Sequence, residues 1–240
     1  VNNLPTGVYN VTVSDANGCS AVTSTIINNL SGGSATASIV TNVSISGGCD
    51  GEASVAMAGG IAPFTYIWND PGTQTTINAT GLCAGTYCVT VTDSNGCASS
   101  DCIIISEPPP IVLSITGINN LCNAGCTGQA TVSAVGGVTP YSYSWSPSGG
   151  IGTVASNLCA NTYTVTLIDA NGATDSISIV ITEPTALSIA LTPSNPLCNA
   201  GCDGEIQAVV TGGTGVHTYL WDDPGTQTTA LANGLCAGSF

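Results

Sequence analysis

One phrase recurs along this chain at a nearly constant spacing. Each copy opens with a leucine, and these leucines are Leu4, Leu82, Leu158 and Leu235, spaced 78, 76 and 77 residues apart. The tryptophans keep the same period, and they are Trp68, Trp145 and Trp221. A fixed period decides the architecture before any local pattern is considered. At this length each repeat is a small domain with a core of its own.

The period divides the sequence into four parts. We expect the C-terminal half of a repeat at 1–33, complete repeats at 34–108 and 109–185, and the N-terminal part of a further repeat at 186–240. Because the chain begins and ends at the same phase, we expect it to be a window on a longer tandem array. The repeats join through "EPPP" and "EPT", where proline stiffens a short linker. Neighbouring repeats are thus the first expected partners.

Short segments rich in Val, Ile and Thr, separated by turn residues, indicate β-strands. In the repeat 34–108 these segments are 37–45, 52–59, 64–68, 73–82, 86–92 and 100–106. Residues alternate with period two where the signal is clearest, as in "TYCVTVT", and helical spacing is nowhere sustained. About seven short strands per repeat predict an all-β chain of tandem Ig-like or fibronectin-III-like β-sandwiches.

The recurring "L-x-x-G-x-Y" has the pattern of a tyrosine corner, in which a tyrosine at the start of strand F hydrogen-bonds back to the preceding arch. Tyr9, Tyr87 and Tyr163 fit this pattern, although Asn161 replaces the glycine in the third copy. Phe240 has no hydroxyl and departs from it. The three tryptophans fall on strand C, where we expect them to anchor each core.

The composition excludes several classes of partner. The chain has no Lys or Arg, 14 Asp and Glu, and one His. Nucleic-acid binding depends on cations that neutralise phosphates, and we therefore expect no nucleic-acid partner. Anionic lipid surfaces should repel the chain as well. No apolar run approaches the ~18 residues of a membrane span, so we expect no spanning segment in these residues.

Twelve cysteines in small domains favour disulfides and an oxidising, extracellular compartment. Metal binding is the alternative, because "CNAGC" at 122–126 and 198–202 has a spacing that zinc sites use. A four-thiolate site needs a second such pair nearby, and each of these repeats offers only Cys159 or Cys236 in addition. Disulfides are the preferred interpretation, and we expect no cofactor.

The hairpin turn 93–96 sets the register of one cysteine pair. Asp-Ser-Asn-Gly suits a type I turn whose glycine is left-handed, which gives a three-residue hairpin loop with a bulge. Paired residue numbers then sum to 190, so Cys88 faces Cys102. The next repeat lacks both cysteines at once, with Thr164 and Ser178 in their places. This co-absence supports a Cys88–Cys102 disulfide.

A second type of pair follows from the geometry of a sandwich, in which the A–B and E–F loops lie at the same pole. One cysteine of each pair is in the A–B loop and the other is in the E–F loop. Three repeats include both positions, and in each of them both cysteines are present. The expected disulfides are Cys49–Cys83, Cys126–Cys159 and Cys202–Cys236.

Four cysteines remain, namely Cys19, Cys97, Cys122 and Cys198. The first two lie in F–G turns, at the pole facing the preceding repeat, and the last two lie in A–B loops, facing the following repeat. The junction between the complete repeats lacks both members, because Ile45 and Ala173 occupy these positions. We therefore expect these four cysteines to form inter-repeat disulfides with repeats beyond the 240 residues.

For the carboxylates and the one histidine, a structural role is the preferred interpretation. Asp15, Asp93 and Asp169 each open a D-x-N-G turn as a lone carboxylate, whereas calcium sites gather several oxygen ligands. Asp222 and Asp223 are the best calcium candidates. His217 falls in the slot of Phe64 and Tyr141, which indicates an aromatic substitute rather than a catalyst. One histidine cannot repeat a Ser/His/Asp set, and we expect no enzyme activity.

Several of these phrases together resemble the SprB-type repeat of Bacteroidetes surface adhesins. The matching residues are Cys198 with "CDG" at 202–204, "GG-x-x-PY" at 136–141, the strand-C tryptophan, "L-x-AG-T-Y" at 82–87 and "D-x-NGC" at 93–97. The resemblance covers essentially the whole chain. It implies a very large, secreted, repetitive protein of the bacterial cell surface that serves in adhesion or gliding. It implies no ligand, since the family's motifs determine the fold.

Glycosylation candidates are frequent in this composition. Asn10, Asn29, Asn42 and Asn78 lie in N-x-S/T sequons. The segment "DSI", which contains Ser176, resembles the O-glycosylation motif of the same phylum. The chain would then be a glycoprotein.

The preferred functional hypothesis is a stiff spacer or filament section of a secreted, disulfide-stapled adhesin, without catalysis. The alternative is an Ig-like module that recognises surface glycan or protein through its B–C loops at 61–63, 138–140 and 214–216. A third hypothesis is an accessory domain of an extracellular enzyme. The uniform negative charge also leads us to expect that acid or calcium promotes lateral association of folded arrays. Self-association, lateral or end-to-end, is thus a further expected partner interaction.

Overall fold

Every regular element of the protein is a β-strand. The computed structural model describes residues 4–28, 32–197 and 201–236 of the 240-residue chain. By its internal contacts the chain divides into two units, Val1–Pro108 and Pro109–Phe240. No helix long and apolar enough to cross a membrane occurs in the described part. The expected all-β fold is confirmed.

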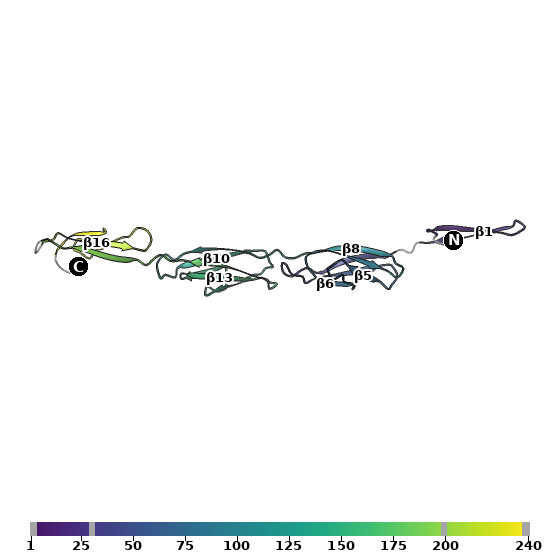
Figure 1. Cartoon of the computed structure of the whole chain (residues 1–240), viewed down its shortest axis with the longest axis horizontal. Coiled ribbons are helices and arrows are strands. Elements are labelled where there is room, and N and C mark those ends of the chain that lie inside the picture. The colour runs from purple at the N-terminus through teal and green to yellow at the C-terminus, as the bar shows by residue number, and fades with distance from the viewer. Residues whose placement is uncertain (1–3, 29–31, 198–200, 237–240) are drawn as a thin grey trace. The chain divides into compact units, whose positions relative to one another are not determined.

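The first unit contains one hairpin and one complete two-sheet sandwich (Figure 1). The hairpin pairs β1 (Gly7–Ser14) with β2 (Ser20–Ile27). One sheet of the sandwich has the order β3 (Ser34–Thr41), β4 (Gly51–Ala58), β6 (Asn78–Leu82). The other sheet has the order β5 (Thr65–Trp68), β7 (Gly85–Thr92), β8 (Ala98–Ile105), and all pairs are antiparallel.

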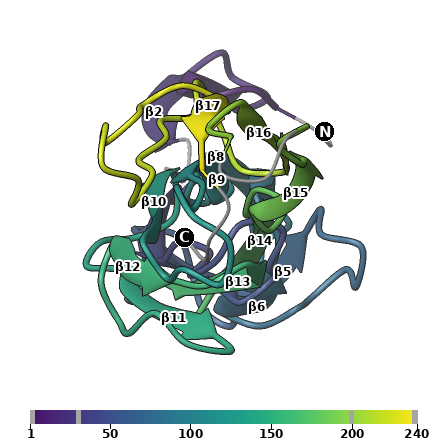
Figure 2. The ribbon, with the colours of Figure 1, turned by 90° about the vertical axis from the view of Figure 1, so that its left-hand side faces the viewer.

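The second unit contains another complete sandwich and one further sheet (Figures 1 and 2). The first sheet has the order β9 (Val112–Ile118), β10 (Gly128–Val135), β12 (Val154–Leu158). It is covered by β11 (Ser142–Ser146), β13 (Asn161–Ile168) and β14 (Thr174–Ile181). The additional sheet has the order β15 (Ser188–Ser194), β16 (Gly204–Thr211), β17 (Leu231–Leu235).

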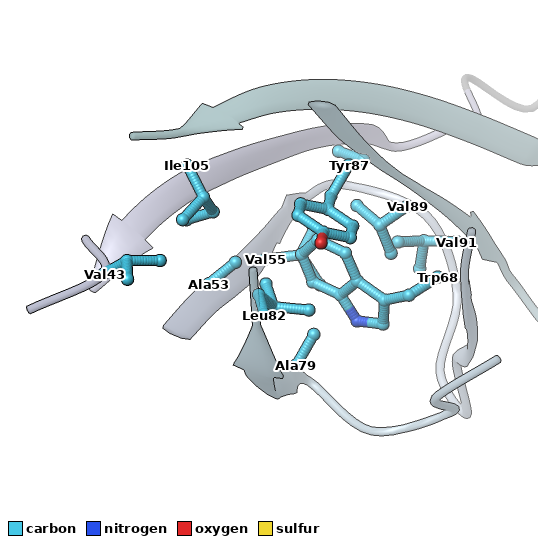
Figure 3. Close-up of a cluster of buried hydrophobic side chains, with 11 residues drawn as sticks. Val43, Ala53, Val55, Trp68, Ala79, Leu82, Tyr87, Val89, Val91 and Ile105 are labelled. Atoms are coloured by element: carbon cyan, nitrogen blue, oxygen red, sulfur yellow. The ribbon is translucent and has the colours of Figure 1, made fainter. Parts of the chain in front are cut away.

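Strands β3 to β8 are, in order, strands A, B, C, E, F and G of the sandwich, and β9 to β14 are the same strands of the next repeat. A tryptophan from strand C fills the centre of each complete sandwich. Trp68 is fully buried, with Leu82 and Ala79 beside it from one sheet and Val89 and Val91 from the other (Figure 3). Its indole Nε1 donates a hydrogen bond of 3.0 Å to a backbone carbonyl of the segment before β6. Burying so large a side chain with its one donor satisfied makes it the main apolar anchor of a small core.

Each complete sandwich has six strands, so the expectation of about seven was too high. The difference lies between strands C and E, where no further strand forms and the expected strand 73–82 is shortened to β6. Asp70 holds the preceding segment in a turn by accepting hydrogen bonds from the backbone N–H groups of Gly72 and Gln74. The Gln74 side chain in turn donates to Asp70 and to the carbonyl of Thr80. These side-chain contacts replace a strand ladder.

The tyrosine corner is confirmed in all three described copies. Tyr9 donates its hydroxyl to the carbonyl of Pro5 at 2.6 Å, and Tyr87 and Tyr163 donate to Cys83 and Cys159 at 3.2 Å each. The bond forms in the third copy although asparagine replaces the glycine of the arch. The fourth copy ends at Phe240, which lies outside the described residues.

Candidate functional sites

The F–G turns are organised by one aspartate each. Asp93 Oδ1 accepts the backbone N–H groups of Asn95 and Cys97, both at 2.9 Å, and Oδ2 accepts that of Ile61 at 3.3 Å. Gly96 has φ +83°, the left-handed conformation that the turn requires. The hydrogen bond from Cys97 lowers the pKa of Asp93; burial opposes it, and the bonds from Ile61 and Asn95 reinforce it. The turn role expected for this carboxylate is confirmed.

The hairpin register places the first cysteine pair face to face. Cys88 lies opposite Cys102 in the β7–β8 ladder, as the turn geometry predicts, and the structure joins them with an S–S distance of 2.07 Å. In the next repeat Thr164 lies opposite Ser178, and their hydroxyls form a 2.8 Å hydrogen bond. A hydroxyl pair thus takes the place of the disulfide on the same outer face of the sheet.

Three further disulfides join the A–B loop to the E–F loop. They are Cys49–Cys83, Cys126–Cys159 and Cys202–Cys236, the same pairs that the loop geometry predicts. Each lies beside the last residue pair of the B–E ladder, such as Gly51 opposite Leu82. In the two complete repeats the disulfides therefore lie at the pole from which the Glu-Pro linker leaves.

The other described cysteines carry free thiols. Cys19 and Cys122 are exposed and Cys97 is half-buried, while Cys198 lies outside the described residues. Cys97 lies beside Gly32, at the point where the chain begins the repeat, since a Cβ added to Gly32 would stand 3.4 Å from the cysteine Cβ. Disulfides from these cysteines to other repeats remain a proposal.

Non-reducing peptide mapping tests the disulfide assignment. We expect Cys88 to be recovered joined to Cys102, because the hairpin register brings no other cysteine opposite it. Cys97 should be recovered in a different peptide pair or as a free thiol. A peptide that joins Cys88 to Cys97 would contradict the register.

A glutamate at the end of each complete repeat holds the A–B loop. Glu107 accepts the backbone N–H of Gly47 at 2.6 Å. Glu183 accepts the Nδ2 of Asn123 and the N–H of Ala124, both at 2.9 Å. Sequence reasoning missed these contacts, although the recurrence of Glu-Pro at both linkers is a signal that could have indicated them.

The residues after each Glu-Pro are held by the next glycine pair. Gly137 donates to the carbonyl of Pro109 at 2.7 Å, and Gly213 donates to that of Thr185 at 2.9 Å. Gly136 has φ +80°, and a Cβ there would stand 1.9 Å from the carbonyl oxygen of Pro110. Only glycine permits the linker backbone to approach so closely.

Asp222 and Asp223, the calcium candidates, have different environments. Asp223 is buried and accepts hydrogen bonds from Gly225 N–H and from Gln227, whose backbone and side chain both donate to it. The Gln227 bonds hold the pKa of Asp223 below its usual range, and burial opposes them. Asp222 is exposed. The described residues contain no group of three or more His, Cys, Asp or Glu that could hold a metal ion.

The imidazole of His217 occupies the position that the Tyr141 hydroxyl has in the preceding repeat. Its Nε2 lies 3.3 Å from the carbonyl oxygen of Gly212, and Tyr141 donates its hydroxyl to the equivalent carbonyl of Gly136. This geometry supports the reading of His217 as an aromatic substitute in the B–C loop.

The glycosylation candidates that can be located are exposed. Asn10 lies on the outer face of β1, Asn42 follows β3, Asn78 begins β6, and Ser176 lies on β14. Asn29 lies outside the described residues. Their exposure is compatible with modification, which stays a prediction.

Tandem Ig-like sandwiches with internal disulfides are an architecture typical of repetitive extracellular proteins. The SprB repeat family model matches three segments of the chain, residues 37–73, 118–150 and 190–226, one in each repeat that contains strands A and B, so the chain is similar to repetitive, adhesin-like regions. The expected resemblance is confirmed. No curated protein matches the chain.

Solved structures similar to the chain include the N-terminal eight Ig domains of Down syndrome cell adhesion molecule isoform 1.30.30, at 14% identity and a TM-score of 0.40. The match covers 91% of this chain, which spans about a third of that fragment (33%). A tetra-tandem repeat from the extending region of a large adhesion protein matches at 18% identity and a TM-score of 0.27, covering 86% of this chain and 64% of that one. The amphioxus IgVJ-C2 molecule matches at 16% identity and 0.27, covering 62% and 96%.

Proposed function

We propose that this chain is a stiff, disulfide-stapled spacer of a secreted cell-surface adhesin, and that it has no catalytic role. The observation that carries the proposal is that each Glu-Pro linker is held by folded structure on both of its sides. A spacer transmits position and force only if its joints resist bending. The contacts at the linkers support the proposal, because they restrict the linker backbone.

The linker 183–185 gives the fullest set of contacts. On one side the Glu183 carboxylate accepts hydrogen bonds from Asn123 and Ala124, and Asn123 also donates to the carbonyl of Pro184 at 3.1 Å. Charge-assisted hydrogen bonds of this kind are stronger than neutral ones. On the other side the Thr185 carbonyl accepts the N–H of Gly213. No residue of this linker is left without a contact to a folded loop.

The linker 107–110 has the same pattern. Glu107 accepts the N–H of Gly47 from the A–B loop of its own repeat. Pro109 accepts the N–H of Gly137, and the close approach of Pro110 to Gly136 fixes where the chain begins its next strand. Proline also restricts the backbone torsions of the linker itself. The same contacts occur at both linkers, which supports a joint whose structure recurs with each repeat.

Disulfides fit the same role. Two of the A–B/E–F disulfides, Cys49–Cys83 and Cys126–Cys159, cross-link the pole from which a Glu-Pro linker leaves. A disulfide stabilises a domain of this size by about 2–4 kcal/mol, mainly by restricting the unfolded chain. A covalent link beside the linker would keep that pole folded when the chain is pulled.

Pulsed electron resonance on the 240-residue chain tests the stiffness of one joint. Spin labels attached through unnatural amino acids at Ile151 and Val216, which are 83% and 97% exposed, report the distance across the linker 183–185. We expect one narrow distance distribution in dilute protein. Replacing the three linker residues with Gly-Ser-Gly should broaden it strongly, because such a linker behaves as a flexible coil.

The single variant Glu183→Gln should broaden the distribution less, and Glu205→Gln is the matched control. It removes one carboxylate from β16 without touching the linker, and the distribution should not change. A broad distribution in the native chain would contradict the spacer proposal.

A further inference from the structure

The outer edge of strand E carries backbone groups that point away from its own sheet. In the repeat 34–108 strand E is β6, and Thr80 lies opposite Glu52 of β4. The N–H of Thr80 donates to Gln74 Oε1 and its C=O accepts from Gln74 Nε2, both at 3.0 Å. The C=O of Asn78 accepts the hydroxyl of Thr76. Side chains of the segment between strands C and E therefore cap the edge at which a further strand would otherwise pair.

The same cap is present in the residues 186–240. Asn233 forms the same two hydrogen bonds with the side-chain amide of Gln227, at 3.0 and 2.9 Å. The hydroxyl of Thr229 donates to the C=O of Leu231. A buried aspartate, Asp223, accepts the Nε2 of the glutamine at 3.0 Å and holds the amide in place, as its counterpart does in the repeat 34–108. The cap thus recurs in detail from one repeat to another.

The repeat 109–185 lacks the side chains that make this cap. Its strand E is β12, and Gly150 and Gly152 occupy the positions of Gln74 and Thr76. The strand-C tryptophan fixes this alignment. The backbone N–H of Trp145 donates to the C=O of Gly150, and its Nε1 donates to that of Gly152, as the earlier tryptophan donates to Gln74 and Thr76. Glycine has no side chain that could bind the edge.

The edge of β12 is therefore uncapped. Ser156 lies opposite Gln129, as Thr80 lies opposite Glu52, so the N–H and C=O of Ser156 point away from the sheet. These groups and the C=O of Val154 have no hydrogen-bonding partner among the described residues. Ser156 and Val154 are both exposed. Since β12 belongs to a complete sandwich, the edge is open because of the side chains of this repeat and not because one of its strands is absent.

The charge beside the edge also differs in this repeat. Glu52 and Glu205 follow the first glycine of β4 and β16, and β10 has Gln129 at that position. The sheet β9–β10–β12 contains no ionisable side chain. Charged side chains at a sheet edge oppose pairing with another chain. Because two copies of a chain with a net charge of −14 repel each other as wholes, an uncharged sheet is where they can approach most readily.

We propose that β12 of one copy pairs antiparallel with β12 of a second copy, so that two three-stranded sheets join across their uncapped edges. The edge offers backbone N–H and C=O groups, which an extended strand satisfies. β12 is itself such a strand and contains no carboxylate. With Ala155 at the two-fold axis, Ser156 of each copy lies opposite Val154 of the other, and the outward groups of both residues pair. The interface is isologous and closes as a dimer. This inference does not rest on the spacer role.

Sedimentation velocity on the 240-residue chain, from about 1 to 100 μM, tests this pairing. The salt concentration is about 1 M, at which a Debye length of about 3 Å screens the repulsion between whole chains. We expect an equilibrium between monomer and dimer. In one variant, residues 146–150 are replaced with the six residues 69–74 of the preceding repeat, Asn-Asp-Pro-Gly-Thr-Gln. This graft supplies the missing glutamine and should weaken dimerisation by at least about tenfold.

The matched control is the same graft with alanine in place of its glutamine. It changes the length and the charge of the segment equally, but it has no amide to bind Ser156. It should dimerise like the native chain. A native chain that stays monomeric at every concentration, or equal dimerisation of the graft and its control, would overturn the proposal.

Hydrogen exchange locates the contact in the native chain. The amides of Val154 and Ser156 point outward, and they should exchange more slowly as the chain concentration and the dimer population increase. Ala155 lies between them and pairs with β10, so its amide is the internal reference. The amide of Thr80, which Gln74 already binds, should not respond to concentration. Dimers that leave the exchange of Val154 and Ser156 unchanged would place the contact elsewhere and contradict the proposal.

Discussion

Replacing Trp68 with alanine should destabilise the repeat 34–108 by about 3–5 kcal/mol, the usual cost of removing a buried aromatic side chain. The indole is fully buried between the two sheets, and its Nε1 bond to Thr76 ties the segment before β6 to the core. A domain of this size has a total stability of about 5–15 kcal/mol. The loss is therefore a large part of what keeps the repeat folded.

Hydrogen exchange measures this effect repeat by repeat. Amides of β7 and β8 should exchange much faster in Trp68→Ala, while those of β13 and β14 in the next repeat serve as an internal reference. Ile67→Ala is the matched control, because Ile67 precedes Trp68 on the same strand and is 57% exposed. It should change exchange little. Loss of protection in both repeats together would show that the two sandwiches do not unfold independently.

Features governed by local geometry could be predicted from the sequence. The turn 93–96 fixes the register of β7 and β8, and that register alone places Cys88 opposite Cys102. The tyrosine corner depends on residues four apart, and it formed even where asparagine replaced glycine. Because the sequence is periodic, the same local features are then predicted at the equivalent positions of every repeat. In this way the Cys88–Cys102 pairing and the tyrosine corner follow from a short phrase.

Contacts between segments distant in sequence could not be predicted in this way. Glu107 meets Gly47, and Glu183 meets Asn123, in each case about 60 positions away. Nothing near either glutamate indicates which loop it binds. The start of the strand expected at 73–82 was placed too early for a different reason, because Gln74, which binds Asp70, has the appearance of a strand residue in a Thr-rich segment. Side-chain hydrogen bonds there override strand propensity.

The carboxylates have structural roles that net charge alone does not reveal. No ion pair can form between side chains of Lys or Arg and Asp or Glu, since the sequence contains neither Lys nor Arg. Asp93 and Asp169 are nonetheless buried, and both accept backbone N–H groups. For Asp169, burial raises the pKa, but the N–H groups of Val138 and Ala173 more than offset this, and the pKa is lowered. Ionised aspartates of this kind stabilise the fold.

The direction of these shifts fixes the response to acid. A carboxyl whose folded pKa is below its unfolded value, near 3.9, contributes stability that is fully present above that value. The contribution is lost as the pH falls through the lower folded pKa. Repulsion between chains depends instead on net charge, which falls as the pH approaches about 4. Charge loss should therefore begin at a higher pH than unfolding.

A titration from pH 7 to 3, followed by light scattering and circular dichroism together, should thus show association near pH 4 while the strands are still intact, and unfolding only at lower pH. Asp93→Asn should unfold its repeat more readily at pH 7, because the neutral amide cannot replace an ionised acceptor of three N–H groups. It should also flatten the pH dependence of that repeat below pH 4, since the group that titrates there is gone. Glu52→Gln removes the same charge from a half-exposed position whose one bond, from Asn78, is 3.3 Å long. It should leave the stability nearly unchanged. If unfolding precedes association in the native chain, aspartates such as Asp93 contribute too little to hold the sandwiches together as the charge is lost.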